Sequence, residues 1–249
     1  GYQVQDSDVG MIQGWQHELG KNAAHLKLRS DVINTQLIKK RYVCTADANL
    51  FLYANPDNHP WHYLRYSFNG VFPTTGIYCD IEPNTKRWQQ ISKDLDIKLE
   101  SEKRNGNHIL ICVQRNGGWS MGTTALDQWC VDVVHQLREK TDRPIVIRDK
   151  APRQQRVTST IFEDLNNCHA LVTYQSIAAV ESVLYGVPAF TTAPTAADPV
   201  CDKDISLIEQ PTVQDTDKIY KWACHLAYGQ FHIDEMKNGS AHRILNEYS

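Results

Sequence analysis

A continuous apolar run, HILICV, occupies His108–Val113 and predicts a buried strand of a parallel sheet. The segment after it, Gln114–Gly122, is rich in glycine, and a helical pattern then covers about Thr124–Lys140. Strand and helix patterns continue to alternate along the rest of the chain. This alternation predicts right-handed βαβ crossovers and a parallel sheet that has helices on both faces.

The same reading predicts the other elements of the second half. The predicted strands are Pro144–Arg148, His169–Tyr174 and Pro188–Thr192. The predicted helices are Ser159–Asn167, a helix opened by Ser176 that ends near Gly186, Thr216–Ala227 and Asp234–Glu247.

The first half has shorter and less regular patterns. Its predicted strands are Val9–Trp15, Tyr42–Ala46 and Leu50–Tyr53, its predicted helices are Ala24–Lys40 and Asn84–Leu95, and Asn55–Thr75 is expected to be mostly loop. The polar segment Lys98–Asn107 is the best linker candidate in the chain. We therefore expect two domains, residues 1–105 and residues 106–249.

Composition excludes several classes of protein. The 249 residues are 41% hydrophobic and 22% charged, which is enough apolar surface for a sizeable core and argues against disorder. A net charge of −3 argues against a dedicated, strongly basic nucleic-acid binder. We see no apolar run long enough for a transmembrane helix and no signal peptide. The seven cysteines include no CxxC pair, so neither a disulfide framework nor a zinc ribbon is expected, and a reducing cytoplasm is the simplest location.

Parallel sheets bind ligands beyond the carboxyl ends of their strands, so ligand-binding residues are expected in the segments that follow the strands. After the first strand of the second half come Arg115, Asn116, Gly117 and Gly118. Glycines allow backbone N–H groups to approach an anion, and the following helix N-terminus favours negative charge. The segment is therefore a candidate phosphate-binding loop, although an ordinary glycine turn would have the same composition.

The next strand is followed by cations at the same expected sheet edge. Arg148, Lys150 and Arg153 lie within six residues of one another. Such a group suits a diphosphate or a sugar acid. A solvated charged loop is the alternative.

The most specific segment is TYQSIAAVESVLYGVP, Thr173–Pro188. Gln175 and Ser176 lie where the predicted helix begins, and Glu181 lies among apolar neighbours within it. A carboxylate in such surroundings needs partners, and a ribose diol is a suitable one. The alternative is a carboxylate that pairs within the fold.

The pattern of Ser176, Glu181, Gly186 and Pro188 resembles the donor-binding half of GT-B-type glycosyltransferases. It is similar to the nucleotide-sugar domain of the transferase family that makes lipid II and to capsule polysaccharide transferases. The resemblance covers about residues 108–192. It implies an α/β fold of two Rossmann-like domains with a cleft between them, in which a compact N-terminal domain faces the acceptor. The C-terminal domain would bind the nucleotide sugar, and its last helices would pack back on the first domain.

The resemblance also implies roles for individual residues. Glu181 would hold the ribose, and Gln175 and Ser176 would lie near the phosphates. Phosphate contacts would come from the glycine loop (Arg115, Asn116, Gly117 and Gly118) and from the cations Arg148, Lys150 and Arg153. The sequence contains neither a DxD pair in the donor region nor a metal-ligand spacing, so we expect chemistry without a metal and no cofactor besides the donor substrate.

An inverting transfer needs a general base near the acceptor hydroxyl. His17, Glu18 and Asp47 follow predicted strands of the first half and are the candidates. Each of them could equally have a structural role.

The acceptor and some rival functions stay open. The acceptor would be a saccharide, free or lipid-linked, or a hydroxymethylated pyrimidine in DNA, as in phage DNA glycosyltransferases. The cations that could meet DNA phosphates, or else form solvated faces, are Lys39, Lys40, Arg41, Arg65, Lys86 and Arg87. The rivals are a sugar-nucleotide epimerase and a non-catalytic nucleotide-binding module of the same architecture.

Overall fold

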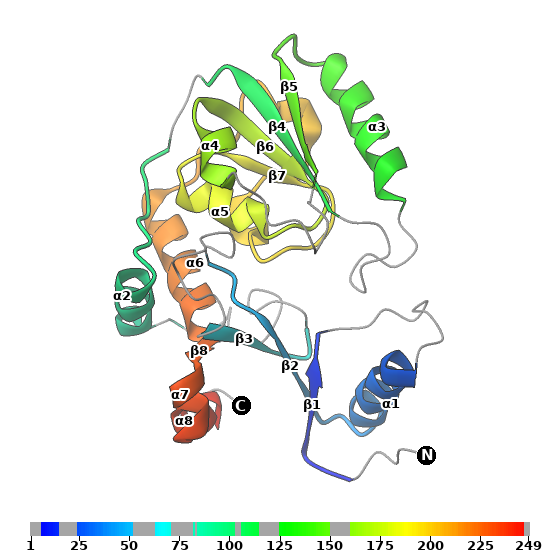
Figure 1. Cartoon of the computed structure of the whole chain (residues 1–249), viewed down its shortest axis with the longest axis vertical. Helices are drawn as coiled ribbons and strands as arrows, with labels where there is room; N and C mark the ends of the chain where they lie inside the picture. Colours follow the sequence, from blue (N-terminus) through cyan, green and yellow to red (C-terminus); the bar gives the residue numbers. More distant parts are fainter. Residues whose placement is uncertain are drawn as a thin grey trace.

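The computed structural model describes residues 6–14, 24–51, 63–70, 82, 84–102, 106–114, 125–149 and 160–246. Within these residues the chain forms a mixed α/β fold with two four-stranded sheets (Figure 1). Sheet A has the strand order β1-β2-β3-β8, and sheet B has the order β5-β4-β6-β7. In Figure 1, sheet B lies above sheet A.

Sheet B confirms the parallel sheet predicted for the second half, because all three of its strand pairs are parallel. Its strands are β4 (His108–Val113), β5 (Ile145–Asp149), β6 (Cys168–Thr173) and β7 (Ala189–Thr191). The predicted bounds of β4 are confirmed, and those of the other three strands differ by one residue at each end.

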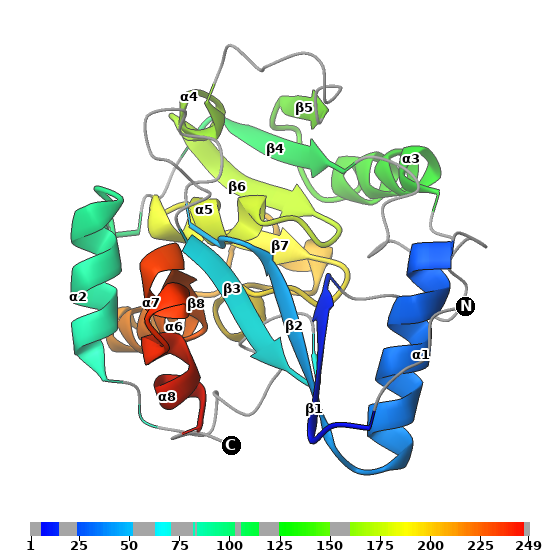
Figure 2. The ribbon, with the colours of Figure 1, turned by 60° about the horizontal axis from the view of Figure 1, so that its bottom comes forward.

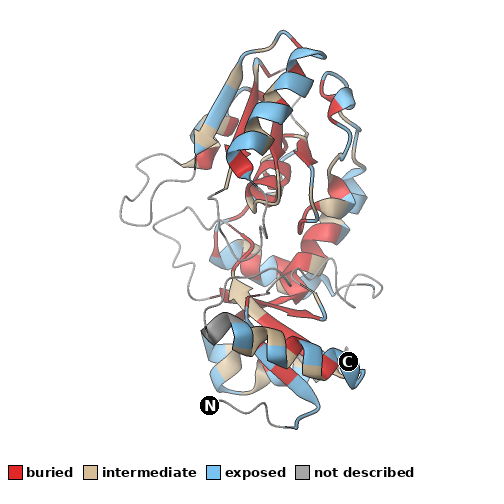
Figure 3. Ribbon diagram, turned by 90° about the vertical axis from the view of Figure 1, so that its right-hand side faces the viewer, coloured by how far each residue is buried: buried red, intermediate tan, exposed pale blue. Residues whose placement is uncertain are grey.

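Helices cover sheet B on both faces, as the crossover rule predicts. The helix α3 (Leu126–Arg138) and the short turn η4 (Ile205–Leu207) pack on the face that contains Ile109 and Ile111. The helices α4 (Ile161–Leu165) and α5 (Ala178–Leu184) pack on the opposite face, which contains Leu110. All three of these strand side chains are fully buried, and each contributes roughly 2 kcal/mol of hydrophobic stabilisation. In Figure 3 the inner strands of this sheet are mostly red, whereas the edge strand β5 and the outer surface of α3 are mostly pale blue or tan.

Sheet A is mixed rather than parallel. Its strands are β1 (Val9–Gln13), β2 (Tyr42–Ala48), β3 (Tyr63–Phe68) and β8 (Gln230–His232). Only β1 and β2, joined through the helix α1 (Ala24–Ile38), are parallel neighbours. Gly10 lets α1 approach the sheet, because a Cβ atom there would lie 2.7 Å from Val32 Cγ1. The carboxyl ends of β1 and β2 point toward sheet B (Figure 1).

The strands of the first half differ from the predicted ones in two places. The segment expected to be mostly loop, Asn55–Thr75, contains β3, which pairs antiparallel with both β2 and β8. Within this strand, Leu64–Phe68 (LRYSF) alternates apolar and polar residues, which is typical of a strand. The abundance of Pro, Asn and Gly in the surrounding segment had favoured a loop instead. Leu50 and Phe51, expected to begin a strand, lie outside any strand, because the Asn49 side chain accepts the Phe51 N–H over 2.6 Å and bends the chain.

The C-terminal segment returns to sheet A. After the helix α6 (Thr216–Tyr228) the chain forms β8, which hydrogen-bonds to β3 and completes the sheet. The prediction of a single helix over Asp234–Glu247 was wrong. The chain forms α7 (Ile233–Lys237) and α8 (Ser240–Asn246), and Gly239 between them has a φ of 79°, which a helix cannot contain. Figure 2 shows α6, α7 and α8 close to β3.

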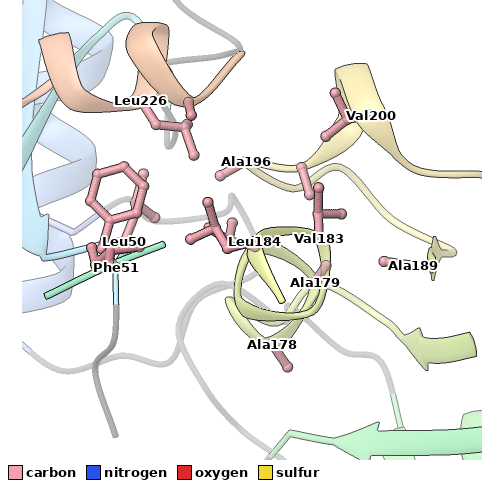
Figure 4. Packing of buried hydrophobic residues seen from close by; sticks show 14 of the residues in the cluster. Leu50, Phe51, Ala178, Ala179, Val183, Leu184, Ala189, Ala196, Val200 and Leu226 are labelled. Carbon is pink, nitrogen blue, oxygen red and sulfur yellow. The ribbon is translucent and has the colours of Figure 1, made fainter. Parts of the chain in front are cut away.

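One buried hydrophobic cluster joins the two halves of the molecule, and further clusters lie against sheet A or sheet B alone. Leu50 and Phe51, which follow β2, belong to the same buried cluster as Leu184 of α5 and Leu226 of α6. Figure 4 shows these side chains converging from both halves of the molecule. The helix α2 (Thr85–Asp94) adds Trp88, whose ring meets Phe51 edge to face at 5.5 Å. The α6–α8 segment is therefore built into the first half as well as the second. The division into domains 1–105 and 106–249 remains our proposal.

Candidate functional site

The strand order of sheet B defines where a ligand would bind. From β4 the chain crosses through α3 to β5 on one side, and from β5 it crosses through α4 to β6 on the other side of β4. The connections thus diverge between β4 and β6. In open α/β sheets, ligands bind at this point, beyond the carboxyl ends of the strands.

Hydrogen bonds fix the carboxyl ends of β4 and β6 against each other. The Thr173 hydroxyl donates to the Cys112 carbonyl over 2.8 Å. Just beyond the strands, the backbone N–H of Gln175 donates to the Gln114 Oε1 atom over 2.9 Å. Gln114 was not among the predicted site residues. Its role depends on two strand ends lying side by side, which the spacing in the sequence does not show.

Gln175 and Ser176 lie at this edge, as predicted. Ser176 does not cap α5 in the strict sense, because the helix begins at Ala178 and its capping residue is Ile177. The Ser176 hydroxyl nevertheless accepts the Ala178 N–H over 3.2 Å. The local turn is thus fixed one residue before the predicted start.

Glu181 is buried, with 4% of its surface exposed, on a helix that is buried along its whole length. Its carboxylate lies near the end of β4. Burial raises the pKa of the Cys112 thiol, and the negative charge of Glu181 raises that pKa further. A buried carboxylate beside the carboxyl end of β4 is well placed to accept hydrogen bonds from ligand hydroxyls.

Of the three predicted cations, the structure describes only Arg148. Arg148 lies in β5, within the predicted strand, and its guanidinium pairs with the Asp164 carboxylate of α4. Its charge is therefore already balanced within the fold. Lys150 and Arg153 lie outside the described residues, as do Arg115, Asn116, Gly117 and Gly118 of the predicted phosphate loop.

Of the three candidate bases in the first half, the structure describes only Asp47. His17 and Glu18 lie outside the described residues. Asp47 lies near the carboxyl end of β2, where its Oδ2 atom accepts a hydrogen bond from Arg65 over 2.9 Å. Arg65 is buried, and this burial lowers its pKa while the Asp47 charge opposes the change. Asp47 thus compensates a buried guanidinium, a role that the sequence did not reveal.

A further group of side chains lies on the β6–β7 side of the edge. The Trp129 indole N–H donates to the Thr192 hydroxyl over 2.8 Å. The Trp129 ring also meets the Tyr174 ring edge to face, with 5.9 Å between the ring centroids. Trp129 and Tyr174 are both half-buried. Their separation by 45 residues in the sequence hid this pair.

Among the described residues, no group of three or more His, Cys, Asp or Glu side chains could hold a metal ion. No helix in the same part of the chain is both long and apolar enough to cross a membrane.

Comparison with known proteins assigns the fold to a class. No protein family matches the sequence, and no curated protein matches it. Solved structures do match, and their fold is that of glycosyltransferases. One is the β Kdo 2,4 transferase of Thermosulfurimonas dismutans KpsC, with a TM-score of 0.55 and 12% identity over 91% of this chain and 85% of that chain. Another is the β Kdo 2,7 transferase of the same protein, with a TM-score of 0.53 and 11% identity over 83% of this chain and 78% of that chain.

Proposed function

We propose that this protein is a glycosyltransferase that moves a sugar from a nucleotide sugar to a hydroxyl acceptor. One observation supports this function above the others: the buried carboxylate of Glu181 lies beside the point of sheet B where the crossovers diverge. The likeness of the fold to two Kdo transferases supports the same class of reaction.

In this proposal the donor lies along the carboxyl edge of sheet B. The Glu181 carboxylate accepts hydrogen bonds from the ribose hydroxyls. The Gln114 Oε1 atom already accepts the Gln175 N–H, so the amide nitrogen of Gln114 is the end that can donate to a phosphate or sugar oxygen. The phosphates would be held by Ser176 and by residues that the sequence places after β4 and β5.

These phosphate ligands are Arg115, Asn116, Gly117, Gly118, Lys150 and Arg153. We propose that they stabilise the leaving phosphate without a metal, because cations and backbone N–H groups can neutralise the developing charge. Arg148 is balanced by Asp164, so we assign it a supporting role beside the nucleoside.

The transfer breaks the bond between the anomeric carbon and the phosphate oxygen, and the electron pair leaves with the phosphate. The acceptor oxygen forms the new bond, and its proton passes to a general base. We propose His17 or Glu18 for this base. Asp47 is the weaker candidate, since its carboxylate is held by Arg65.

For the acceptor we propose a saccharide, and for the transferred sugar a sugar acid of the Kdo type, in line with the names of the two structural neighbours. The DNA alternative is less well supported, because four of its six candidate cations form ion pairs within the protein. Lys39 and Arg41 both pair with Asp6, Arg65 pairs with Asp47, and Arg87 pairs with Glu235. Binding to duplex DNA that falls steeply with salt would restore that alternative.

A thermal-shift panel tests the proposal, because a ligand that binds the folded state raises the melting temperature. The panel would contain UDP-glucose, UDP-N-acetylglucosamine, GDP-mannose and CMP-Kdo, each beside its free nucleotide. We expect one nucleotide family to stabilise the protein, and the Glu181→Gln variant to lose that stabilisation. A lack of any shift across the panel would contradict the proposal. Turnover of the nucleotide sugar without an acceptor would indicate the epimerase, and binding without turnover would indicate a binding module.

A further inference from the structure

The carboxyl edge of sheet B differs in chemistry from one side to the other. On the face covered by α4 and α5 lie the charged groups of Glu181, Arg148 and Asp164, all close enough to act on the Cys112 thiol. On the face covered by α3, Trp129 lies with Tyr174 and the Thr192 hydroxyl. The Gln114–Gln175 hydrogen bond lies between the two sides.

The aromatic side is held rigidly. The Thr192 N–H donates to the Thr173 carbonyl over 3.3 Å, and the Ala193 N–H donates to the Tyr174 carbonyl over 3.0 Å, so the segment after β7 is fixed to the end of β6. The Lys203 ammonium donates to the Thr191 hydroxyl over 2.6 Å and braces the same segment. The indole hydrogen bond to Thr192 then fixes the orientation of the Trp129 ring.

These groups have the chemistry of a sugar-binding wall. The Trp129 and Tyr174 rings meet at 74°, so they form a corner rather than a flat stack. Aromatic rings pack against the C–H faces of sugars, and a rigid ring does so with little loss of conformational entropy. The Thr192 hydroxyl accepts the indole N–H, which leaves its own proton for a sugar oxygen.

We propose that Trp129, Tyr174 and Thr192 contact the transferred sugar of the donor. This inference rests on the proposed function. A nucleotide sugar is a chain of nucleoside, phosphate and sugar. If Glu181 binds the ribose at the face covered by α4 and α5 and the phosphates cross the Gln114–Gln175 bond at the strand ends, the sugar reaches the face covered by α3. The aromatic corner then selects the sugar, whereas Glu181 selects the nucleotide.

The test compares two ligands on each variant of the full chain. Equilibrium binding by calorimetry would use the nucleotide sugar that gives the largest thermal shift among the four named above, and the matching free nucleotide. Trp129→Ala is expected to weaken binding of the nucleotide sugar about tenfold, while the Kd of the free nucleotide changes less than about twofold. Thr192→Val, at an exposed position, is expected to weaken only the nucleotide sugar, by about threefold. Val131→Ala, at a 50% exposed position of the same helix, is the matched control and should change neither Kd.

The two arms separate the possible failures. Retained binding of the free nucleotide by Trp129→Ala shows that the variant is folded, so a loss confined to the sugar arm supports the assignment. Unchanged binding of the nucleotide sugar, or an equal loss in both arms for Trp129→Ala and Thr192→Val, would overturn it. If the unaltered protein binds no member of the panel, the proposed function itself fails, and this inference fails with it.

Discussion

The backbone N–H of Gln175 donates to the side-chain oxygen of Gln114 over 2.9 Å, and this hydrogen bond extends the contact between β4 and β6 beyond their paired strands, where the crossovers of sheet B diverge. It links two segments that are 61 residues apart in the chain. Both segments belong to the proposed donor site, so the bond fixes the distance between them before any ligand arrives.

Removal of the Gln114 acceptor should lower the free energy of unfolding modestly. Replacement of Gln114 by a charged acceptor should weaken binding of the donor nucleotide. Gln114→Leu lacks the acceptor and is expected to lower the free energy of unfolding by about 1 kcal/mol, measured by urea denaturation. Gln114→Glu keeps an acceptor oxygen but adds negative charge where we propose that phosphate binds. It should therefore unfold close to the unaltered protein yet bind the donor nucleotide at least about fivefold more weakly. Equal nucleotide affinity in Gln114→Glu would argue against phosphate at this edge.

Loss of the Glu181 carboxylate should weaken nucleotide binding at least about tenfold, because hydrogen bonds to a charged group contribute roughly 1.5–3 kcal/mol. Glu181→Gln is the variant of choice, since it preserves the volume at a buried position. Calorimetry with the free nucleotide measures the loss, and circular dichroism checks the fold. Glu163→Gln, at an exposed position of α4, is the matched control and should bind normally. A Glu181→Gln protein that is folded and retains full affinity would remove the ribose assignment.

Arg87 should be important for stability rather than for binding. Its guanidinium pairs with Glu235 over 2.7 Å, donates to the Gln230 carbonyl and lies 4.6 Å from the centre of the Phe231 ring. Arg87→Ala leaves a partly buried carboxylate without its partner and is expected to lower the free energy of unfolding by roughly 2 kcal/mol.

A double-mutant cycle with Glu235→Ala measures the coupling between these two side chains in urea denaturation. Lys86→Ala, at the neighbouring exposed position, should change stability by less than about 0.5 kcal/mol. Additive effects of the Arg87 and Glu235 substitutions would show that the pair contributes nothing as a pair.

His169 should make the protein less stable in mild acid. Burial lowers the pKa of His169 below its ordinary value of 6.5, and the nearby Arg143 lowers it further, although Glu209 and the Ile208 carbonyl oppose this change. As the pH falls through 6.5, the unfolded chain therefore takes up a proton at this position before the folded chain does, and the free energy of unfolding decreases. Protonation of the folded state would also put a proton on the buried Nδ1 atom, which has no hydrogen-bond partner among the described residues.

Urea denaturation at pH 7.5 and pH 5 tests this expectation. The decrease in stability between the two pH values should be smaller for His169→Gln than for the unaltered protein. His242→Gln, at an exposed position, should leave the decrease unchanged. The same decrease in all three proteins would show that other groups cause the acid sensitivity.

Much of sheet B could be predicted from the sequence because its order is local. His108–Val113 is an uninterrupted apolar run between polar segments, and the observed β4 has the same bounds. Gly186 was expected to end a helix, and it follows α5 with a φ of 81°. Such signals depend on neighbouring residues alone.

Sheet A was harder to predict because its partners are distant in the chain. The strand β3 pairs with β8, so Leu64 lies opposite Phe231. No local pattern encodes that contact, and β8 itself has only three residues.

The candidate site shows the same limit. Glu181 could be selected from its place in a motif, but the partners of Arg148 and Asp47 could not. Asp164 and Arg65 are separated from those residues by 16 and 18 positions and reach them only through packing of the folded chain. Pairing of this kind decides whether a charged residue is available to a ligand.

The pairing of β8 with β3 also sets the order in which this protein can be completed during synthesis. Sheet A begins with β1 at Val9, but its last strand ends at His232, so the sheet lacks one edge until the segment up to His232 has left the ribosome. During that interval the edge of β3 is an open template for strands of other chains. We expect a nascent chain stopped before Gln230 to aggregate or to recruit chaperones, and one released after His232 to close the sheet with its own strand.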